Sequence, residues 1–291
     1  MTDRSPFPPT APPPRPVSAG LYLVATPIGN LRDMTLRALD VLAAADLVLA
    51  EDTRVTARLM TAYGLKAKLE RCDDHASPRA AEHAIQRIAE GAVVALVSDA
   101  GTPLISDPGF VVARAVIAAG LPVHPIPGPS SLLAALTMAG LPADQVLFAG
   151  FLPPRSAARR TALEAFRTGR HTLVFFESGP RLADSLADMA AVLGSRPAAV
   201  CRELTKLYEE CVRGPLDAMA ADPRLNAPKG EIVVVVGPGE ADIASAEDAD
   251  VALAEALTRL PPGEAASEVS RALGLPRKPL YRRALDLKAG G

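Results

Sequence analysis

The sequence has no tryptophan, only three cysteines and no long uninterrupted hydrophobic run. Cys72, Cys201 and Cys211 are an odd number and lack the spacing of metal ligands or of a disulfide framework. This cysteine usage predicts a protein of the reducing cytoplasm that holds no metal. No apolar run approaches the ~18 residues that cross a bilayer, and the N-terminus has no signal-peptide pattern, so we expect no membrane association.

The common nucleotide-binding motifs are also missing. The chain has no G-x-x-x-x-G-K-[ST] phosphate loop, and no G-x-G-x-x-G follows its first predicted strand. These absences argue against an enzyme that uses ATP or a dinucleotide. The net charge of -2 excludes a general attraction for polyanions. Any contact with nucleic acid therefore has to come from local basic patches.

What is present is an alternation of strand-like and helix-like segments along 291 residues, enough for about two domains. In the first half we expect strands at 21–25, 46–50, 92–97 and 122–126, with helices at 35–44, 53–63, 78–90 and 110–119. This alternation predicts a largely parallel sheet with helices on both faces. In the second half we expect strands at 146–151, 172–177, 198–202 and 231–237, with helices at 132–139, 156–168 and 181–193.

The predicted fold is therefore α/β, with two α/β domains at 17–127 and 128–240 and a cleft between them. Residues 1–16 contain seven prolines and are expected to form a disordered tail. Residues 246–291 form a helical extension, with predicted helices at 251–260, 264–273 and 279–287, a breaker at 261–263 and a turn at Gly274. The apolar side of the second helix is expected to consist of Val269, Ala272 and Leu273, and that of the third of Leu280, Ala284 and Leu287. These two helices have the outline of a helix-turn-helix, and the basic end of the extension is a candidate RNA-binding surface.

Two loops rich in small and polar residues follow predicted strands, at 98–109 and at 127–131. In open α/β sheets, ligands bind at the carboxyl ends of strands. The backbone of 98–102 can hold charged ligand groups, and Ser130 and Ser131 stand at a helix start that suits a polar or anionic group. The alternative is that both loops are turn-rich connectors that cap the next helix.

Five motifs carry a resemblance to a known family. They are ATPIGN at 25–30, EDTR at 51–54, SDAGTP at 98–103, PGPSS at 127–131 and RELTK at 202–206. In this order they resemble the tetrapyrrole-methylase superfamily and, within it, the RNA-modifying branch. The resemblance implies a homodimer with S-adenosylmethionine in the interdomain cleft. It also implies methyl transfer to the 2′-hydroxyl of a cytidine in the decoding region of 16S rRNA.

The resemblance also implies roles for individual residues. It assigns cofactor binding to Asp99, Ala100, Gly101, Thr102, Ser130, Ser131, Ala149 and Phe176. It assigns catalysis to Glu51, Asp52 and Arg54, and substrate binding to Thr26, Pro27, Gly29 and Asn30. Independently of the resemblance, two local basic patches make Arg155, Arg282 and Arg283 candidate RNA contacts. Because a ribose hydroxyl is a poor acid, a base would help, and the candidates are Glu51, Asp52 and Asp99. Further phosphate contacts are expected from arginines at 159, 160, 167 and 170.

The chain departs from the family pattern at two places. His75 is followed by Ala76 rather than by asparagine, and the segment 175–181 lacks the histidine that the family shows before its arginine. Two other functions stay open at this point. One is a tetrapyrrole C-methyltransferase, which typically has a glycine-rich first loop that this chain lacks. The other is a nucleic-acid-binding ligand sensor without enzymatic activity.

Overall fold

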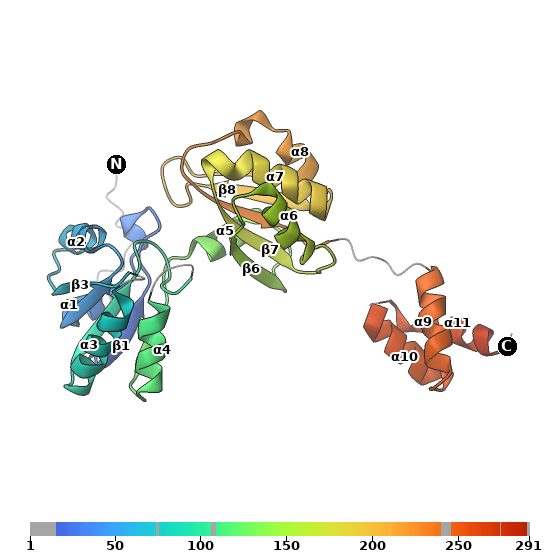
Figure 1. Ribbon diagram of the computed structural model, residues 1–291, viewed down its shortest axis with the longest axis horizontal. Helices are drawn as coiled ribbons and strands as arrows, with labels where there is room; N and C mark the ends of the chain where they lie inside the picture. Colours follow the sequence, from blue (N-terminus) through green and yellow to red (C-terminus); the bar gives the residue numbers. More distant parts are fainter. Residues whose placement is uncertain (1–15, 74–75, 106–108, 240–245, 274, 290–291) are drawn as a thin grey trace, which may run out of the picture.

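The computed structural model describes residues 16–73, 76–105, 109–239, 246–273 and 275–289. Several sequence predictions lie outside these residues, namely the proline-rich tail up to residue 15, His75, positions 106–108 of the long loop and the turn at Gly274. The elements form two sheets with their helices and a separate group of C-terminal helices (Figure 1). No helix in the described part of the chain is long and apolar enough to cross a membrane.

The first sheet has five parallel strands in the order β3-β2-β4-β1-β5. They are β1 (Gly20–Val24), β2 (Leu47–Ala50), β3 (Leu69–Arg71), β4 (Val93–Val97) and β5 (Val123–Ile126). Helices α1 (Leu36–Ala44) and α2 (Thr53–Ala62) pack on one face, while α3 (Ser77–Ala89) and α4 (Phe110–Ala118) pack on the other. The predicted parallel sheet with helices on both faces is confirmed. All five residues of the central β4 are buried, which fits its run of apolar, mainly β-branched side chains.

The second sheet is mixed, with the order β6-β7-β10-β8-β9. Its strands are β6 (Val146–Phe151), β7 (Thr172–Ser178), β8 (Pro197–Arg202), β9 (Glu210–Pro215) and β10 (Glu231–Val236). Among its neighbouring strands, β6 and β7 pair in parallel. β10 lies between β7 and β8 and is antiparallel to both, and β9 is antiparallel to β8. We did not predict β9, in which the apolar Cys211 and Val212 are flanked by the charged Glu210 and Arg213 at an edge of the sheet.

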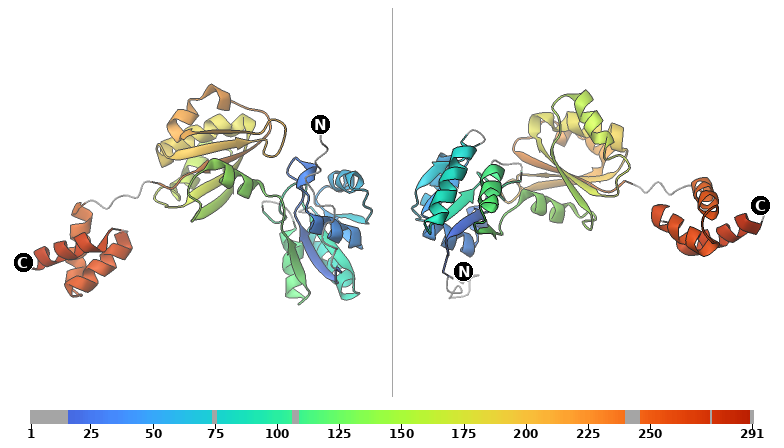
Figure 2. Two further views of the ribbon diagram at one scale, coloured as in Figure 1. Left: turned by 180° about the vertical axis from the view of Figure 1, so that it is seen from behind. Right: turned by 60° about the horizontal axis from the view of Figure 1, so that its bottom comes forward.

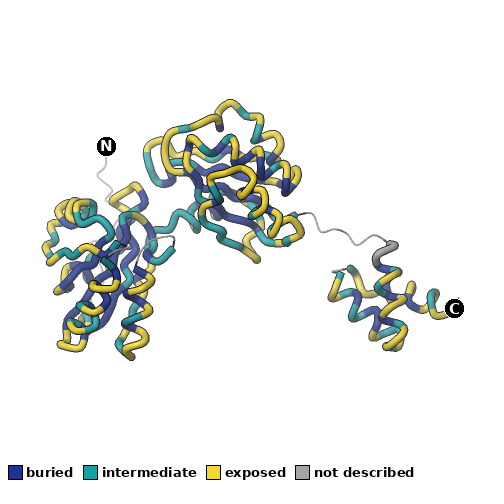
Figure 3. The backbone as a smooth tube through the Cα atoms, viewed as in Figure 1, coloured by how far each residue is buried: buried dark blue, intermediate teal, exposed yellow. Residues whose placement is uncertain are grey.

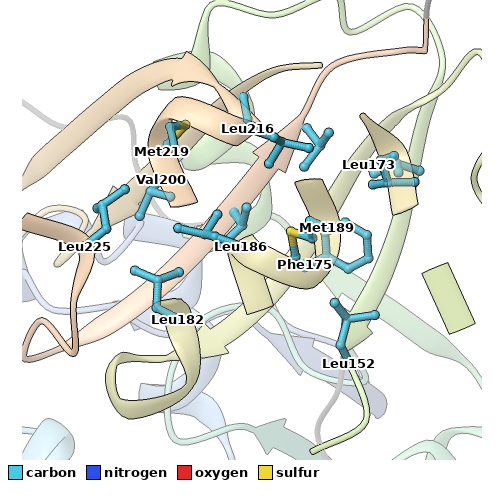
Figure 4. Close-up of a cluster of buried hydrophobic side chains, with 14 of the residues drawn as sticks. Leu152, Leu173, Phe175, Leu182, Leu186, Met189, Val200, Leu216, Met219 and Leu225 are labelled. Atoms are coloured by element: carbon cyan, nitrogen blue, oxygen red, sulfur yellow. The ribbon is translucent and has the colours of Figure 1, made fainter. Parts of the chain in front are cut away.

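Helices cover both faces of the second sheet. Helix α5 (Ser131–Ala139) packs on one face. Helices α6 (Ser156–Glu164), α7 (Gly179–Leu193) and α8 (Leu216–Ala220) pack on the other, over the core drawn in Figure 4 around Phe175, Leu186 and Met189. The predicted helix at 156–168 is shorter than expected, because turns follow its end at Glu164. Figure 2 shows the two sheets in separate lobes, each with its own helices, and Figure 3 shows buried residues concentrated in the interior of each lobe.

The C-terminal group consists of α9 (Ala246–Leu257), α10 (Pro262–Leu273) and α11 (Arg277–Ala289). It has its own core, to which Val269, Leu280 and Ala284 contribute as predicted. Two expectations are wrong here. Pro262 begins α10 instead of breaking the chain, since proline is tolerated in a first helical turn. Ala272, which we placed on the apolar side of its helix, is exposed.

Candidate functional site

Three loops meet at the carboxyl edge of the first sheet. β1 lies between β4 and β5, so the loops that follow these strands are neighbours. The backbone N–H of Thr26 donates to the Gly101 carbonyl at 2.9 Å, and the Gly101 N–H donates back at 3.0 Å. The Thr26 hydroxyl donates to the Ser98 carbonyl, and the Thr102 hydroxyl donates to the Pro129 carbonyl, both at 3.1 Å. The three predicted ligand loops are therefore one hydrogen-bonded unit.

A pocket of about 370 Å³ lies beside this unit and takes its lining from both halves of the chain. Ala100, Ser131 and Phe176, which the sequence assigned to the cofactor, line it together. Phe176 makes edge contacts with Phe148 and Phe151, with ring centroids 4.9 and 5.6 Å apart. The other lining residues are Ile28, Phe151, Glu177, Ser178, Leu204, Gly230, Glu231, Ile232 and Val233. Aromatic and aliphatic walls with a few polar groups are typical of a small-molecule site.

The other predicted cofactor residues lie around this pocket and do not line it. Gly101 and Thr102 hold the loops together through the hydrogen bonds above, and Gly101 has a φ of 81°, which favours glycine. Ser130 is the N-cap of α5, and its hydroxyl accepts from the Leu133 N–H at 3.5 Å. The side chain of Ala149 packs against the core on the opposite face of the sheet. Asp99 lines a second pocket instead.

The family resemblance placed the cofactor near residues 176–177, and Glu177 lines the pocket, but the segment 230–233 was not assigned to the site. β10 runs antiparallel to β7, with Glu231 paired to Ser178, so the start of β10 lies beside the end of β7. We looked for ligand residues where strands end, and this segment is where a strand begins. The Lys229-Gly230-Glu231 sequence was the available signal, since Gly230 has a φ of 104° and a Cβ there would lie 2.5 Å from Glu203 Oε1.

The second pocket, of about 270 Å³, lies within the first half of the chain. Thr26, Pro27 and Gly29 of the predicted substrate loop line it together with Ser98 and Asp99. Its remaining walls come from Leu31 and from residues 55, 56, 58, 59 and 62 of α2. The Asn30 carboxamide oxygen accepts from the Arg32 N–H at 3.1 Å and so caps the short 3-10 helix at Leu31–Asp33.

The predicted catalytic segment 51–54 stands at the start of α2. The Asp52 carboxylate accepts from the Arg54 backbone N–H at 2.8 Å and pairs with its guanidinium at 2.5 Å. These contacts hold the pKa of the Asp52 carboxyl well below its usual range. Asp52 is therefore a weak base, whereas Asp99, which accepts from the Asp52 N–H at 3.0 Å, lines the second pocket directly. Glu51 is half-buried beside them.

The arginines predicted to contact RNA phosphates differ in how exposed they are and in which carboxylates they already pair with. Arg155 and Arg282 are exposed. Arg283 is also exposed, and its guanidinium pairs with Asp250 of α9 at 2.5 Å. Arg159, which we expected to meet phosphate, is buried and pairs with the buried Asp188 at 2.7 Å, so it serves the fold of α6 against α7. Among the described residues, no group of three or more His, Cys, Asp or Glu side chains is placed to hold a metal ion.

Comparisons with known proteins match most of the chain. Residues 20–220 match the family described as Tetrapyrrole (Corrin/Porphyrin) Methylases, and residues 243–288 match the RsmI C-terminal HTH domain. A protein of Erythrobacter litoralis named ribosomal RNA small subunit methyltransferase I is 50% identical over 94% of this chain and 97% of its own length. Its namesake in Escherichia coli O157:H7 is 45% identical over 91% of this chain and 94% of its own.

Solved structures agree on the fold. A uroporphyrin-III-C-methyltransferase of Thermus thermophilus has a TM-score of 0.53 and 25% identity over 75% of this chain and 94% of its own. The predicted two-domain fold and helical extension are thereby confirmed. The chain belongs to the ribosomal RNA small subunit methyltransferase I family, within the tetrapyrrole methylases.

Proposed function

We propose that this chain transfers a methyl group from S-adenosylmethionine to the 2′-hydroxyl of a cytidine in the decoding region of 16S rRNA. The observation that carries the proposal is 50% identity, over nearly the full length of both chains, to a protein named as a methyltransferase of small-subunit ribosomal RNA. The match of residues 243–288 to the C-terminal domain of the same family supports RNA rather than a tetrapyrrole as the acceptor.

The pocket of about 370 Å³ fits the methyl donor. Phe151 and Phe176 offer apolar surface for an adenine ring, and the Ser131 hydroxyl at the start of α5 suits a carboxylate or a ribose. The exposed carboxylate of Glu231 favours the cationic end of the donor. The Glu177 carboxylate is buried and is bound by Arg181 and Ser185 of α7. When bound, the donor supplies an electrophilic methyl group on a sulfonium, so that the protein's main task is to position the two reactants.

The acceptor ribose is proposed to enter the second pocket, beside Thr26, Pro27, Gly29 and Asn30. Asp99 is then the best placed of the three candidate bases, because it lines that pocket and adjoins Ala100 of the donor pocket. It would accept the proton of the 2′-hydroxyl as the methyl group arrives. In this arrangement Asp52 and Arg54 hold the start of α2, and Glu51 lies next to them.

We further propose that residues 17–127, 128–240 and 246–291 are the three domains of the chain, and that Arg155, Arg282 and Arg283 contact RNA phosphates. Arg283 would have to exchange Asp250 for a phosphate to do so. A ribosomal substrate implies a cytoplasmic location.

A homodimer is also part of the proposal. Phe110 and Val111, large apolar side chains on α4, are exposed, and so is Leu133 on α5. Exposed apolar surface of this kind is typical of a subunit contact. Light scattering on the purified protein gives the oligomeric state, and charged substitutions at Phe110 and Leu133 are expected to yield monomers.

Transfer of tritiated methyl groups from S-adenosylmethionine tests the activity. The acceptors are small ribosomal subunits that lack the modification, naked 16S rRNA and a porphyrinogen. We expect label in the RNA, at a nucleotide whose 3′ linkage resists alkaline hydrolysis, and none in the porphyrinogen. A chain without residues 246–291 is expected to bind the donor normally and to lose RNA methylation. Label in the porphyrinogen alone, or donor binding without transfer to any acceptor, would refute the proposal.

A further inference from the structure

The loop between β8 and β9, residues 203–209, presents two large apolar side chains to solvent. Leu207 is 88% exposed and Tyr208 is 69% exposed. Single exposed apolar residues are common on protein surfaces, but two adjacent ones that are this exposed indicate a surface that contacts a partner. The rest of the loop shows how they are held and where they lie.

Internal contacts and backbone strain fix the loop. The Thr205 N–H donates to the Glu209 carboxylate at 2.6 Å, and the Lys206 N–H donates to the Glu203 carbonyl at 3.0 Å. Glu203 and Thr205 have φ values of 51° and 65°, in the region that β-branched and other non-glycine residues rarely adopt. Such conformations cost about 1–3 kcal/mol each and persist only where the surroundings impose them. The backbone of the loop is therefore held in one conformation, which fixes the place from which the Tyr208 side chain projects.

Lys206 places the loop against the proposed acceptor site. Its side chain lies so close over Gly29 that a Cβ there would be 2.4 Å from Lys206 Cγ. Its ammonium group pairs with Glu203 at 2.8 Å and with Glu231 at 3.1 Å. Gly29 lines the second pocket and Glu231 lines the first, so Lys206 spans the border between the two pockets. Tyr208 follows two residues later.

The charges around the loop indicate what part of an RNA it meets. Three cations at 202, 206 and 229 face four carboxylates at 203, 209, 210 and 231. Most of these groups already pair with one another, as Arg202 does with Glu210 at 2.9 Å. A surface with a slight excess of negative charge does not attract phosphates. The face of a base is uncharged, and base–aromatic stacking is the usual way in which proteins hold splayed, single-stranded nucleotides.

We propose that Tyr208 stacks on a base of the RNA next to the reacting ribose and holds that nucleotide out of its helical stack, with Leu207 in apolar contact beside it. This inference rests on the proposed function and adds the residue that grips the acceptor base. A protein partner is a poorer occupant, because two adjacent side chains offer far less area than the ~800 Å² per partner of a stable interface.

The first test uses the absence of tryptophan in this chain. Tyr208→Trp introduces a single indole at the proposed stacking position, and Ala187→Trp introduces one on the exposed side of α7, on the opposite face of the second sheet. Addition of small ribosomal subunits that lack the modification should quench the fluorescence of Tyr208→Trp and leave Ala187→Trp unchanged. Because quenching needs no turnover, it reports on stacking even if methyl transfer fails.

The second test is kinetic. Tyr208→Ala is expected to raise the KM for the ribosomal subunit about 5- to 150-fold, with donor affinity unchanged, and Tyr208→Phe is expected to be close to native. Equal quenching in both tryptophan variants, or a native KM in Tyr208→Ala, would overturn the inference. Conversion of Tyr208→Ala to a different oligomeric state would also overturn it, in favour of a subunit contact. A native protein that methylates no RNA would refute the proposed function separately.

Discussion

Gly179, the first residue of α7, allows a close approach of two chain segments at the donor pocket. A Cβ on Gly179 would lie 1.8 Å from the Pro228 carbonyl oxygen, a separation that real Cβ atoms essentially never show. The carbonyl belongs to the backbone and cannot turn away as a flexible side chain can. Gly179→Ala therefore displaces the segment around Pro228 by more than 1 Å. That segment leads directly into Gly230 and Glu231, which line the pocket.

We expect Gly179→Ala to cost about 1–3 kcal/mol of stability, typical of an overpacked interior, and to lower Tm by about 2–12 °C. Affinity for S-adenosylmethionine should fall with it, since one wall of the pocket moves. Circular dichroism follows the unfolding, and calorimetry measures the donor affinity. Gly214→Ala is the matched control, because the nearest atom to its Cβ, in Met219, is 3.6 Å away. Native Tm and native affinity in Gly179→Ala would refute the reasoning.

Three further predictions concern a buried ion pair, a buried thiol and an ion pair in the loop of residues 203–209. Asp188→Asn leaves the buried Arg159 without its counter-ion, so urea unfolding should show a loss of about 3–5 kcal/mol. Burial raises the pKa of the Cys201 thiol to about 12, so peptide mapping should find Cys201 unmodified by thiol reagents in the native protein at pH 8. The hydrogen bond from Lys206 lowers the pKa of Glu203. Stability from that carboxylate is therefore present above its unfolded pKa, near 4.3, and is lost as pH falls through the lowered folded value. The difference in Tm between the native protein and Glu203→Gln should shrink below pH 4.

Each of these three predictions has an outcome that contradicts it. Native stability in Asp188→Asn would mean that water or another group compensates Arg159. Modification of Cys201 at pH 8 at the rate seen in denaturant would mean that it is not buried. If the difference in Tm between the native protein and Glu203→Gln stays constant down to pH 3, the ion pair between Glu203 and Lys206 does not contribute to stability.

Four of the five strands of the first sheet were predicted from the sequence, because most of them are apolar runs connected by helices. β3, with the sequence Leu-Glu-Arg, has no such run and was not predicted. Val93–Val97 is one such run, and a parallel sheet covered on both faces is the arrangement that buries it. The second half was harder. β9 has only two apolar residues, Cys211 and Val212, before Gly214 and Pro215, so its pattern resembles a loop, and it is identified as a strand only by its pairing with β8. Pairing between distant segments leaves no local trace in the sequence.

The site was predicted in part for the same reason. Loops that follow parallel strands converge by a general rule, and Ala100, Ser131 and Thr26 came together as that rule implies. Arg159 was misjudged because an arginine on a polar helix face and one buried against an aspartate look alike in sequence. What separates them is Asp188, which comes from the next helix.

The proposed donor and acceptor pockets share a wall, an arrangement that would bring the two reactants together without a large rearrangement. Asp99 lines one pocket and its neighbour Ala100 lines the other, so a single peptide unit forms part of the wall between them. The bridge between Thr26 and Gly101 fixes that wall from the acceptor side, and the bond from Thr102 to Pro129 fixes it from the side of α5. Methyl transfer depends on reactants held a few tenths of an ångström from the reacting geometry. The small, hydrogen-bonded residues of 98–102 meet that requirement better than long flexible side chains, because their positions are set by the backbone.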